Sequence, residues 1–360
     1  MQPFVYTGLP SRIVFGQGAL AKLGEEIDRL GLRRLMVVAT PEQKSSAERT
    51  AAGVGERAVG LFAEAAMHTP LDVTERALLV ATEMRADGLL AIGGGSTTGL
   101  AKAIAFRTDL PQIVAPTTYA GSEMTPILGE TRNGVKTTLR SLKVLPETVI
   151  YDVDLTLTLP VDLSATSGLN AIAHAVEALY AEERNPIVTM MAEEGVRAFA
   201  RALPVIVREP QDREARSAAL YGAWLCGACL GSVGMALHHK LCHTLGGSFD
   251  LPHSQTHAIV LPHVVAYNAP ATPDAMARLS RALGVEDPAM GLFELGRRIG
   301  APSALRDLGM PREGVERATD LALANPYWNP RPLERDAIRQ LIADAWSGFA
   351  PRAAAGARAA

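Results

Sequence analysis

The sequence predicts an α/β N-terminal domain with a mostly parallel sheet, followed by an all-α C-terminal domain. Between about Arg12 and Leu155, short β-rich runs alternate with helical patterns, which is typical of strands joined by crossover helices. Four of these runs are continuously apolar, as expected of strands covered on both faces: 34–40, 88–95, 112–118 and 148–155. Beyond Pro160, long segments rich in Ala, Leu, Arg and Glu follow one another with few strand signals. We therefore expect an α/β domain over 1–160 and a helical domain over 161–360.

Composition points to a small-molecule partner. The 360 residues include 35 Lys and Arg against 38 Asp and Glu, so the formal charge of -3 creates no field that would attract nucleic acid or an acidic membrane. No apolar run approaches the roughly 18 residues that cross a bilayer, and the N-terminus lacks the layout of a signal peptide. Three cysteines form no disulfide framework. We expect a cytoplasmic protein without a membrane or nucleic-acid partner.

Three consecutive glycines, Gly93, Gly94 and Gly95, follow one of the apolar runs and precede a helix that we expect to begin near Ser96 or Thr97. Glycine lets backbone amides approach a pyrophosphate closely, and a helix N-terminus adds unpaired N–H donors and partial positive charge. Ser96 and Thr97 can cap the helix or donate to a phosphate. The spacing is not GxGxxG, and a tight turn without a ligand is the alternative.

Other strand ends offer further contacts for such a ligand. Thr117, Thr118 and Ser122 follow the run at 112–118, where ligands bind in open α/β sheets. Thr40 ends the first run, where a site that prefers NAD normally offers a carboxylate to the adenosine ribose. Because Thr40 offers only a hydroxyl and no Arg lies in this stretch, we expect NADPH to be tolerated beside NADH.

The second half contains a histidine array in which one member is replaced by asparagine. Asn170 and His174 lie four residues apart in an apolar helical segment, His239 and His243 repeat that spacing, and His253 follows in a loop. Such i,i+4 pairs can build a metal site. Asn170, however, is neutral and leaves three imidazoles without a carboxylate to offset a divalent cation. We expect one shared site, with the geometry of a metal centre but not its charge.

The cysteines have a simpler interpretation. Cys226 and Cys229 form a CxxC among small apolar residues, with neither a second CxxC nor a thioredoxin-like context, so buried thiols in a packed helix explain them better than redox or zinc chemistry. Cys242 lies among the histidines, and its thiol is a candidate reactive group.

Three other histidines, His238, His257 and His263, are interpreted as structural. Arg331 has two alternatives: it binds an acidic substrate, or it forms a surface salt bridge.

Several segments together resemble the iron-containing (group III) alcohol dehydrogenase superfamily over nearly the full length, and within it the maleylacetate reductase branch. The resemblance is carried by GGGSTTGLAKAIA (93–105), PTTYAGSEMTPILGET (116–131), KTTLRSLKVLPETVIYDVDLTLTLP (136–160), the SGLNAIAHAVEALY helix and the stretch 238–268. It implies that 1–160 binds a dinucleotide and 161–360 is catalytic, with the active site in the cleft between the two domains and a homodimeric assembly.

The resemblance also implies roles for the histidine array. In metal-dependent members, an aspartate and three histidines at positions matching 170, 174, 239 and 253 hold the cation, and a histidine matching His243 lies beside the nicotinamide. This chain departs from that pattern at Asn170 and at Gly99, which stands where those enzymes carry the aspartate of GGGSxxD. Both departures resemble the maleylacetate reductase branch, whose members work without added metal.

The implied reaction is the reduction by NADH or NADPH of the carbon-carbon double bond of maleylacetate, a dicarboxylate, to 3-oxoadipate in aromatic compound degradation. Because that bond is conjugated to a ketone, charge develops on an enolate oxygen, which imidazole donors can stabilise without a metal. We expect His243 to donate the proton, His253 and His239 to bind the oxyanion or a carboxylate, and Asn170 to position His174 or water.

Three alternatives remain open. The first is a metal-dependent alcohol or aldehyde dehydrogenase of the same superfamily, which would use the three histidines and water. The second is a lyase similar to the dehydroquinate synthases, which use NAD only transiently. The third is a binding module without catalysis, in which both the glycine turn and the histidine array would be idle.

Overall fold

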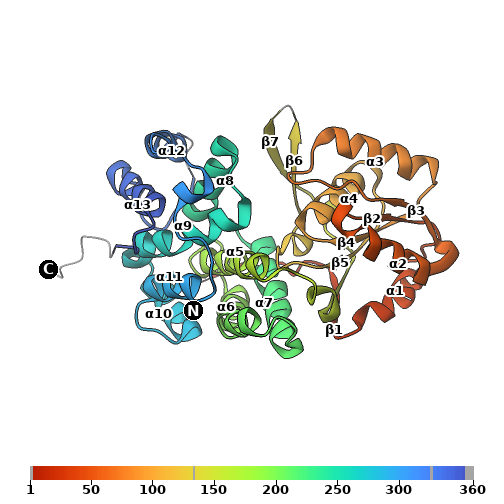
Figure 1. The fold of residues 1–360 in the computed structure, drawn as a ribbon, viewed down its shortest axis with the longest axis horizontal. Coiled ribbons are helices and arrows are strands. Elements are labelled where there is room, and N and C mark those ends of the chain that lie inside the picture. The colour runs from red at the N-terminus through yellow and green to blue at the C-terminus, as the bar shows by residue number, and fades with distance from the viewer. Residues whose placement is uncertain (1–2, 133, 325–326, 353–360) are drawn as a thin grey trace. The chain divides into compact units, whose positions relative to one another are not determined.

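The computed structural model describes residues 3–132, 134–324 and 327–352, and the chain divides into two compact units. The first unit is Gly8–Leu159, and the second is Pro160–Ala360 together with Met1–Thr7. The first unit contains the strands and the second is helical, which confirms the predicted fold class (Figure 1).

A six-stranded, entirely parallel sheet forms the centre of the first unit, in the order β1-β8-β5-β4-β2-β3. Its strands are β1 (Arg12–Gly16), β2 (Leu35–Val38), β3 (Ala58–Phe62), β4 (Gly88–Gly93), β5 (Gln112–Pro116) and β8 (Thr148–Asp152). A separate antiparallel hairpin pairs β6 (Ile127–Arg132) with β7 (Val135–Arg140).

Apolar side chains cover both faces of this sheet. Along β2, Leu35 and Val37 enter one hydrophobic cluster, while Met36 and Val38 enter another, because successive strand residues point to opposite faces. The first cluster includes residues of α1 (Leu23–Arg29) and α2 (Lys44–Val54), and the second includes residues of α3 (Leu71–Glu83) and α4 (Gly95–Thr108). The sheet therefore has helices on both sides, as the continuous apolar runs predict.

The four predicted runs correspond to β2, β4, β5 and β8, which are the four inner strands of the sheet. The two strands that the sequence did not single out, β1 and β3, are its edges. Edge strands are covered less completely, and the burial of both is mixed, although β3 (AVGLF) and the centre of β1 (IVF) are apolar in sequence.

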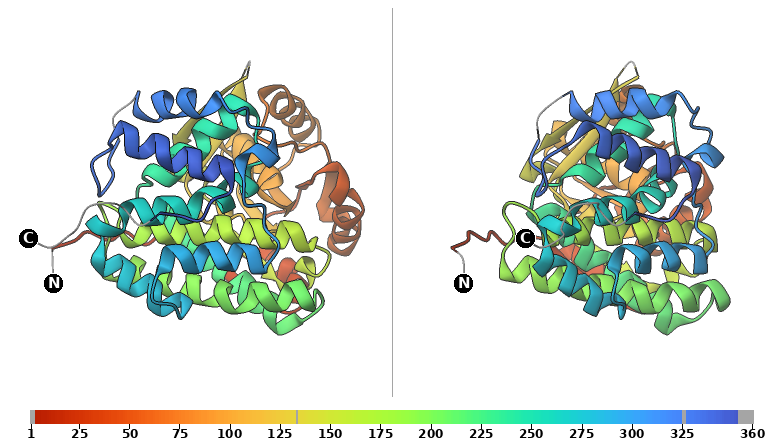
Figure 2. Two further views of the ribbon diagram at one scale, coloured as in Figure 1. Left: turned by 60° about the vertical axis from the view of Figure 1, so that its left-hand side comes forward. Right: turned by 90° about the vertical axis from the view of Figure 1, so that its left-hand side faces the viewer.

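Nine helices build the described part of the second unit: α5 (Val161–Leu179), α6 (Pro186–Arg208), α7 (Arg213–Ser232), α8 (Leu237–Phe249), α9 (His253–Asn268), α10 (Pro273–Leu283), α11 (Pro288–Arg298), α12 (Gly314–Leu323) and α13 (Arg335–Ser347). Helix α5 is central, since it packs against α6, α7 and α9 (Figure 2). Nearly all of its residues are buried, which explains why its sequence contains few charged residues.

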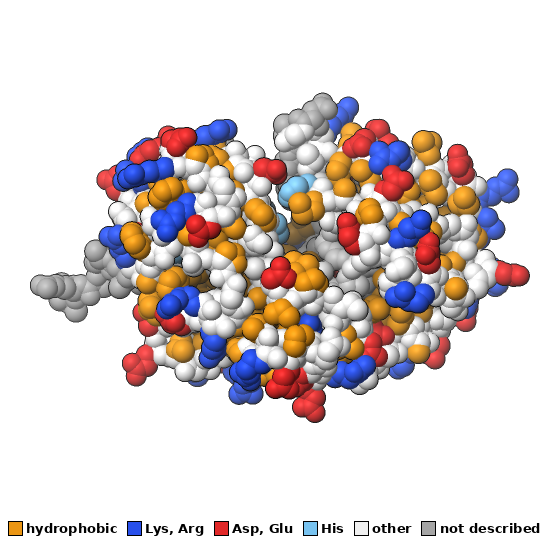
Figure 3. All heavy atoms as spheres, in the orientation of Figure 1, with side chains coloured by type: hydrophobic (Ala, Val, Ile, Leu, Met, Phe, Trp, Pro, Cys, Tyr) orange, Lys and Arg blue, Asp and Glu red, His pale blue; other side chains and the backbone are white. Residues whose placement is uncertain are grey.

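Short 3-10 helices complete the chain: Ala19–Lys22, Pro41–Gln43, Gly55–Arg57, Ser122–Met124, Leu142–Val144, Val153–Thr156, Ala269–Ala271 and Leu305–Leu308. No single helix of the described ranges has the length and hydropathy to cross a membrane; α7 and α8 meet that test only as a pair bent by 95°. Acidic and basic side chains are interspersed on the face shown in Figure 3.

Candidate active site

Three polar side chains lie on one face of the otherwise apolar helix α5. Asn170, His174 and Glu177 follow one another at spacings of four and three residues, so they stack along the same side of the helix. All three are buried. Neither the Asn170 Oδ1 nor the His174 Nδ1 has a hydrogen-bond partner within the described protein, which is costly in a buried site unless a ligand pairs with them.

Glu177 joins α5 to the start of α8. Its Oε1 accepts a hydrogen bond from the His238 backbone N–H at 2.7 Å, and its Oε2 accepts one from the Ala236 N–H at 2.9 Å. The Oε2 also lies 2.7 Å from the His239 Nδ1. This carboxylate therefore fixes both the beginning of α8 and the ring of His239.

The four predicted histidines lie in one chain of neighbouring rings. The ring centroids of His174 and His239 are 5.1 Å apart, those of His239 and His243 are 6.2 Å apart, and those of His243 and His253 are 6.5 Å apart. His174 and His239 are buried, whereas His243 and His253 are exposed. The array thus runs from the interior of the helical unit to its surface.

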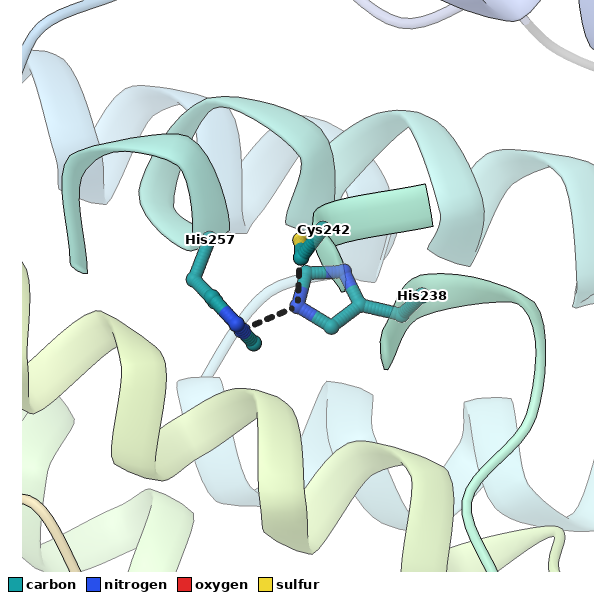
Figure 4. Close-up of side chains that lie close together, drawn as sticks. All are labelled: His238, Cys242 and His257. Atoms are coloured by element: carbon teal, nitrogen blue, oxygen red, sulfur yellow. Dashed lines mark hydrogen bonds between the residues drawn. The ribbon is translucent and has the colours of Figure 1, made fainter. Parts of the chain in front are cut away.

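His238 and His257, which the sequence analysis set apart as structural, lie in contact with this array. The His257 ring is 4.3 Å from that of His253 and 5.1 Å from that of His239. The His238 Nε2 forms a 2.9 Å hydrogen bond with the His257 Nδ1 and lies 3.7 Å from the Cys242 Sγ (Figure 4). Two further i,i+4 spacings in the sequence, 238 to 242 and 253 to 257, were the available signal for these contacts.

Burial keeps the inner histidines neutral. Desolvation, followed by repulsion from neighbouring imidazoles, lowers the pKa of His174, His238 and His257 well below the ordinary value of a histidine. Desolvation likewise raises the pKa of the Cys242 thiol well above its ordinary value, so Cys242 is a buried neutral group and not an activated nucleophile.

The glycine turn of the first unit lies at the carboxyl ends of β4 and β5. Gly93 ends β4, with φ +156°, and a side chain there would lie 2.2 Å from the Thr97 Oγ1. A Cβ on Gly94 would lie 2.9 Å from the Thr118 Cγ2. Helix α4 begins at Gly95, slightly earlier than expected, because Gly94 itself takes the N-cap position in an extended conformation. The glycine turn and the two threonines at 117–118 are therefore adjacent, as the predicted cofactor contacts require.

Buried polar atoms without a partner gather around this turn. They are the Gln43 Oε1, the Thr97 Oγ1 and the Ser122 Oγ. A Cβ on Gly93 would approach the first two within 2.4 Å, and Gln43 Nε2 donates to the Thr117 Oγ1 at 2.6 Å. Because buried polar groups are normally paired, this arrangement indicates a polar ligand. Gln43 was missed in the sequence, although it stands three residues after Thr40.

A buried lysine connects α4 to the segment that carries Ser122. The Lys102 Nζ donates to the carbonyl oxygens of Ser122, Thr125 and Ile127 at 2.5, 2.7 and 3.0 Å. Burial lowers the pKa of Lys102 to about 7 and raises that of the nearby Glu123, which accepts a 2.9 Å hydrogen bond from the Tyr151 hydroxyl. Lys102 therefore fixes the segment that begins at Ser122 to helix α4.

A carboxylate lies beside Thr40, although the strand end itself offers only a hydroxyl. Thr40 precedes the 3-10 helix Pro41–Gln43, and a hydrogen bond from its hydroxyl lowers the pKa of the exposed Glu42 carboxyl. The tight turn therefore brings Glu42, two residues along the chain, back beside Thr40, and the tolerance of NADPH beside NADH stays a prediction.

The remaining candidates are structural. Cys226 and Cys229 are fully buried in α7, and desolvation raises the pKa of both thiols, that of Cys229 to about 12. Arg331 stacks on the Tyr267 ring at 4.3 Å and donates to the Tyr267 carbonyl at 3.0 Å, with Glu334 3.5 Å away. These contacts favour the salt-bridge interpretation of Arg331.

Comparison with known proteins accounts for both units. The family model for iron-containing alcohol dehydrogenases matches residues 10–153. A second family model, for the C-terminal part of the Fe-containing alcohol dehydrogenase family, matches residues 164–346. The chain therefore belongs to the iron-containing alcohol dehydrogenase family.

Individual proteins of known name or structure are also similar to this chain. The chain is 59% identical to a maleylacetate reductase of Rhizobium sp. (strain MTP-10005), over 98% of this chain and all of the relative. The crystal structure of a maleylacetate reductase from Agrobacterium tumefaciens is 58% identical, with a TM-score of 0.95, and the match covers 98% of this chain and all of that one. The structure of a 1,3-propanediol oxidoreductase is 26% identical, with a TM-score of 0.89, over 96% of this chain and all of that one.

The family name implies an iron ion, and the donor set at the corresponding positions does not fit one. The positions that the resemblance assigns to the metal, 170, 174, 239 and 253, supply three imidazoles and one carboxamide in this chain. Ferrous sites built from histidine normally include a carboxylate, and the carboxylate of Glu177 is occupied by the His239 ring and two backbone N–H groups. Among the described residues, the group of three His, Cys, Asp or Glu side chains whose donor atoms all lie within 4.8 Å of one another is His238, Cys242 and His257, and its two imidazoles are hydrogen-bonded to each other.

Proposed function

We propose that this protein catalyses the NAD(P)H-dependent reduction of the carbon-carbon double bond of maleylacetate to 3-oxoadipate in the degradation of aromatic compounds. The observation that carries the proposal is the full-length similarity to maleylacetate reductases, at 59% identity. Asn170 in the histidine array supports it, because a substrate that forms an enolate needs hydrogen-bond donors rather than a Lewis acid.

We assign dinucleotide binding to 1–160 and catalysis to 161–360. The glycine turn fits a pyrophosphate, because side chains at Gly93 and Gly94 would fill the space that backbone amides need. Gly95, Ser96 and Thr97 open helix α4, whose N-terminus favours an anion. Thr40 follows β2, and Thr117 and Thr118 follow β5, the two strands on either side of β4, while Ser122 begins the 3-10 helix after β5.

When bound, the reduced nicotinamide would supply the hydride that adds to the alkene carbon beta to the ketone. The role of the protein would be to stabilise the negative charge that develops on the ketone oxygen and to deliver a proton. We assign the proton to His243, which is exposed and can exchange with solvent. His253 and His239 bind the oxyanion or a carboxylate of the substrate, and Asn170 positions His174 or a water molecule.

NADH is the preferred cofactor in this proposal. The Glu42 carboxylate beside Thr40 repels a 2′-phosphate and can accept hydrogen bonds from ribose hydroxyls. The ratio of kcat/KM for NADH and NADPH measures this preference directly.

The direct test of the function is NADH oxidation with maleylacetate, followed by identification of the product. We expect stoichiometric formation of 3-oxoadipate and oxidised cofactor. Absence of turnover with maleylacetate would refute the proposed substrate, and a product formed without net consumption of NADH would indicate the lyase alternative instead.

A metal-dependent alcohol or aldehyde dehydrogenase remains the second candidate, favoured by three histidines at the family's ligand positions. Turnover of simple alcohols that depends on added iron or zinc would support it. The cytoplasmic location and the homodimer stay predictions, to be tested by cell fractionation and by light scattering.

A further inference from the structure

We propose that Glu177 is a positioning residue, which sets the tautomer and orientation of His239 so that the His239 Nε2 faces the reacting oxygen of the substrate. Glu177 is three residues after His174 on α5 and is fully buried. The inference rests on the proposed function, because it deepens the role assigned to His239.

The hydrogen bonds around Glu177 show how its two oxygens are used. Three nitrogen atoms converge on them: the His238 backbone N at 2.7 Å, the Ala236 backbone N at 2.9 Å and the His239 Nδ1 at 2.7 Å. Two of them are backbone N–H groups, which can only donate. Each of the two Glu177 oxygens thus accepts from a backbone N–H, which is the arrangement that suits a carboxylate, a group that accepts but does not donate.

The tautomer of His239 follows from this arrangement. Since the carboxylate can only accept, the Nδ1 of His239 carries the proton that lies between the two groups. The second ring nitrogen, Nε2, is then the atom available to a ligand. It is buried and has no hydrogen-bond partner within the described protein. A histidine oriented by a carboxylate in this way has a fixed ring plane; when its Nε2 also carries a proton, that nitrogen can donate to an oxygen of the substrate while the carboxylate offsets the positive charge of the ring.

The same carboxylate also fixes the start of α8, which raises a competing explanation. By holding the N–H groups of Ala236 and His238, Glu177 anchors the helix that carries His239 and, one turn later, His243. A purely structural role would act through this anchor and not through the His239 ring. The test must therefore separate the ring contact from the backbone contacts.

Glu183 offers a matched control. It is exposed, and its Oε2 accepts a 3.1 Å hydrogen bond from the Gly234 N–H in the connection between α7 and α8. Glu183→Gln therefore alters a carboxylate that holds the same connection, and no contact between Glu183 and a histidine ring is found among the described residues. Glu177→Gln preserves the size of the side chain and one of the two acceptor oxygens but removes the charge and replaces the other acceptor by an amide group, so the double substitution with His239→Gln is needed to separate the ring contact from the backbone contacts.

The experiment combines proton NMR with steady-state kinetics on maleylacetate and NADH. We expect a strongly deshielded Nδ1 proton in the wild-type protein and in Glu183→Gln, and its loss in both Glu177→Gln and His239→Gln. We expect kcat to fall by about 10- to 100-fold in Glu177→Gln, the range for losing a residue that orients a functional histidine, while KM for NADH is unchanged. When Glu177→Gln is added to His239→Gln, kcat should fall by less than about twofold further, since the two residues act as one unit.

Other outcomes overturn the inference without touching the proposed function. Persistence of the deshielded proton in Glu177→Gln would show that the carboxylate does not hold the ring. An equal loss of kcat for Glu177→Gln and Glu183→Gln, or the same additional loss in the His239→Gln background, would assign Glu177 to the helix anchor alone. If Glu177→Gln does not fold, the spectra of the wild-type protein and of His239→Gln still test the hydrogen bond between Glu177 and His239. A deshielded proton that is present in the wild type and absent from His239→Gln supports that bond, and its absence from the wild type contradicts it. Absence of maleylacetate reduction by the wild-type protein would instead refute the function itself.

Discussion

Alanine substitutions at the three consecutive glycines should have sharply different effects, because each glycine has a different environment. At Gly93, φ is +156° and a methyl group would lie 2.2 Å from the Thr97 Oγ1 and 2.4 Å from the Gln43 Oε1. Backbone strain of this kind costs about 1–3 kcal/mol, and overpacking adds about as much again. We expect Gly93→Ala to lower the free energy of unfolding by about 3 kcal/mol or more.

The other two substitutions should be tolerated by the fold. Gly94 has φ -87° and ψ -158°, which any residue adopts, and its methyl would meet only the Thr118 side chain at 2.9 Å. We expect a loss of about 1 kcal/mol. Gly95 opens α4, and its methyl would make an ordinary 3.5 Å contact with Ala120. Gly95→Ala should be neutral or stabilise the protein by up to about 1 kcal/mol.

Urea unfolding and the KM for NADH test this series together. Gly94→Ala should raise KM for NADH about tenfold, equivalent to about 1.4 kcal/mol, because its methyl occupies the approach of the backbone to the pyrophosphate. If Gly93→Ala were as stable as Gly95→Ala, the geometry of the turn would be wrong. An unchanged KM for NADH in Gly94→Ala would show that the pyrophosphate does not bind at this turn.

Four further predictions concern the two units. Lys102→Met should destabilise the protein by about 3 kcal/mol in urea unfolding, because buried carbonyl groups lose their donor. Burial lowers the pKa of His263 to about 4, so the unfolded chain takes up a proton near pH 6.5 and the folded chain only near pH 4. The free energy of unfolding should therefore fall by about 3 kcal/mol as the pH drops from about 6.5 to about 4. In the His263→Asn variant, the free energy of unfolding should depend less on pH over this range. Glu42→Gln should shift the kcat/KM ratio toward NADPH by about tenfold, and an unchanged ratio would exclude Glu42 from cofactor selection. Asn170→Asp should increase bound divalent metal in elemental analysis and lower kcat on maleylacetate about tenfold; full activity would contradict the role given to the neutral side chain.

The sequence predicted the interior of the sheet better than its edges. Strands β2, β4, β5 and β8 are buried on both faces, which leaves a continuous apolar run that can be recognised without a structure. Strands β1 and β3 have one neighbour each and are less buried, and their short apolar segments, IVF and AVGLF, were overlooked although they resemble those of the inner strands. The large helical unit was predictable because helical periodicity is local.

The histidine array was found from spacing alone, whereas its supporting residues were not. The i,i+4 pairs placed Asn170 with His174 and His239 with His243 on common helix faces. Glu177 was missed because a glutamate in a helix is usually solvated, and only the tertiary packing of α5 buries it. Gln43 was missed for a similar reason, since its contact with Thr117 joins two strand ends far apart in sequence.

The most direct test of the central claim, that histidine side chains and not a metal stabilise the enolate, is the kcat for maleylacetate measured beside the metal content of the same sample after prolonged treatment with a strong chelator. We predict an unchanged kcat in protein that contains far less than one metal ion per chain. Loss of activity on chelation, restored by one equivalent of iron or zinc, would contradict the account.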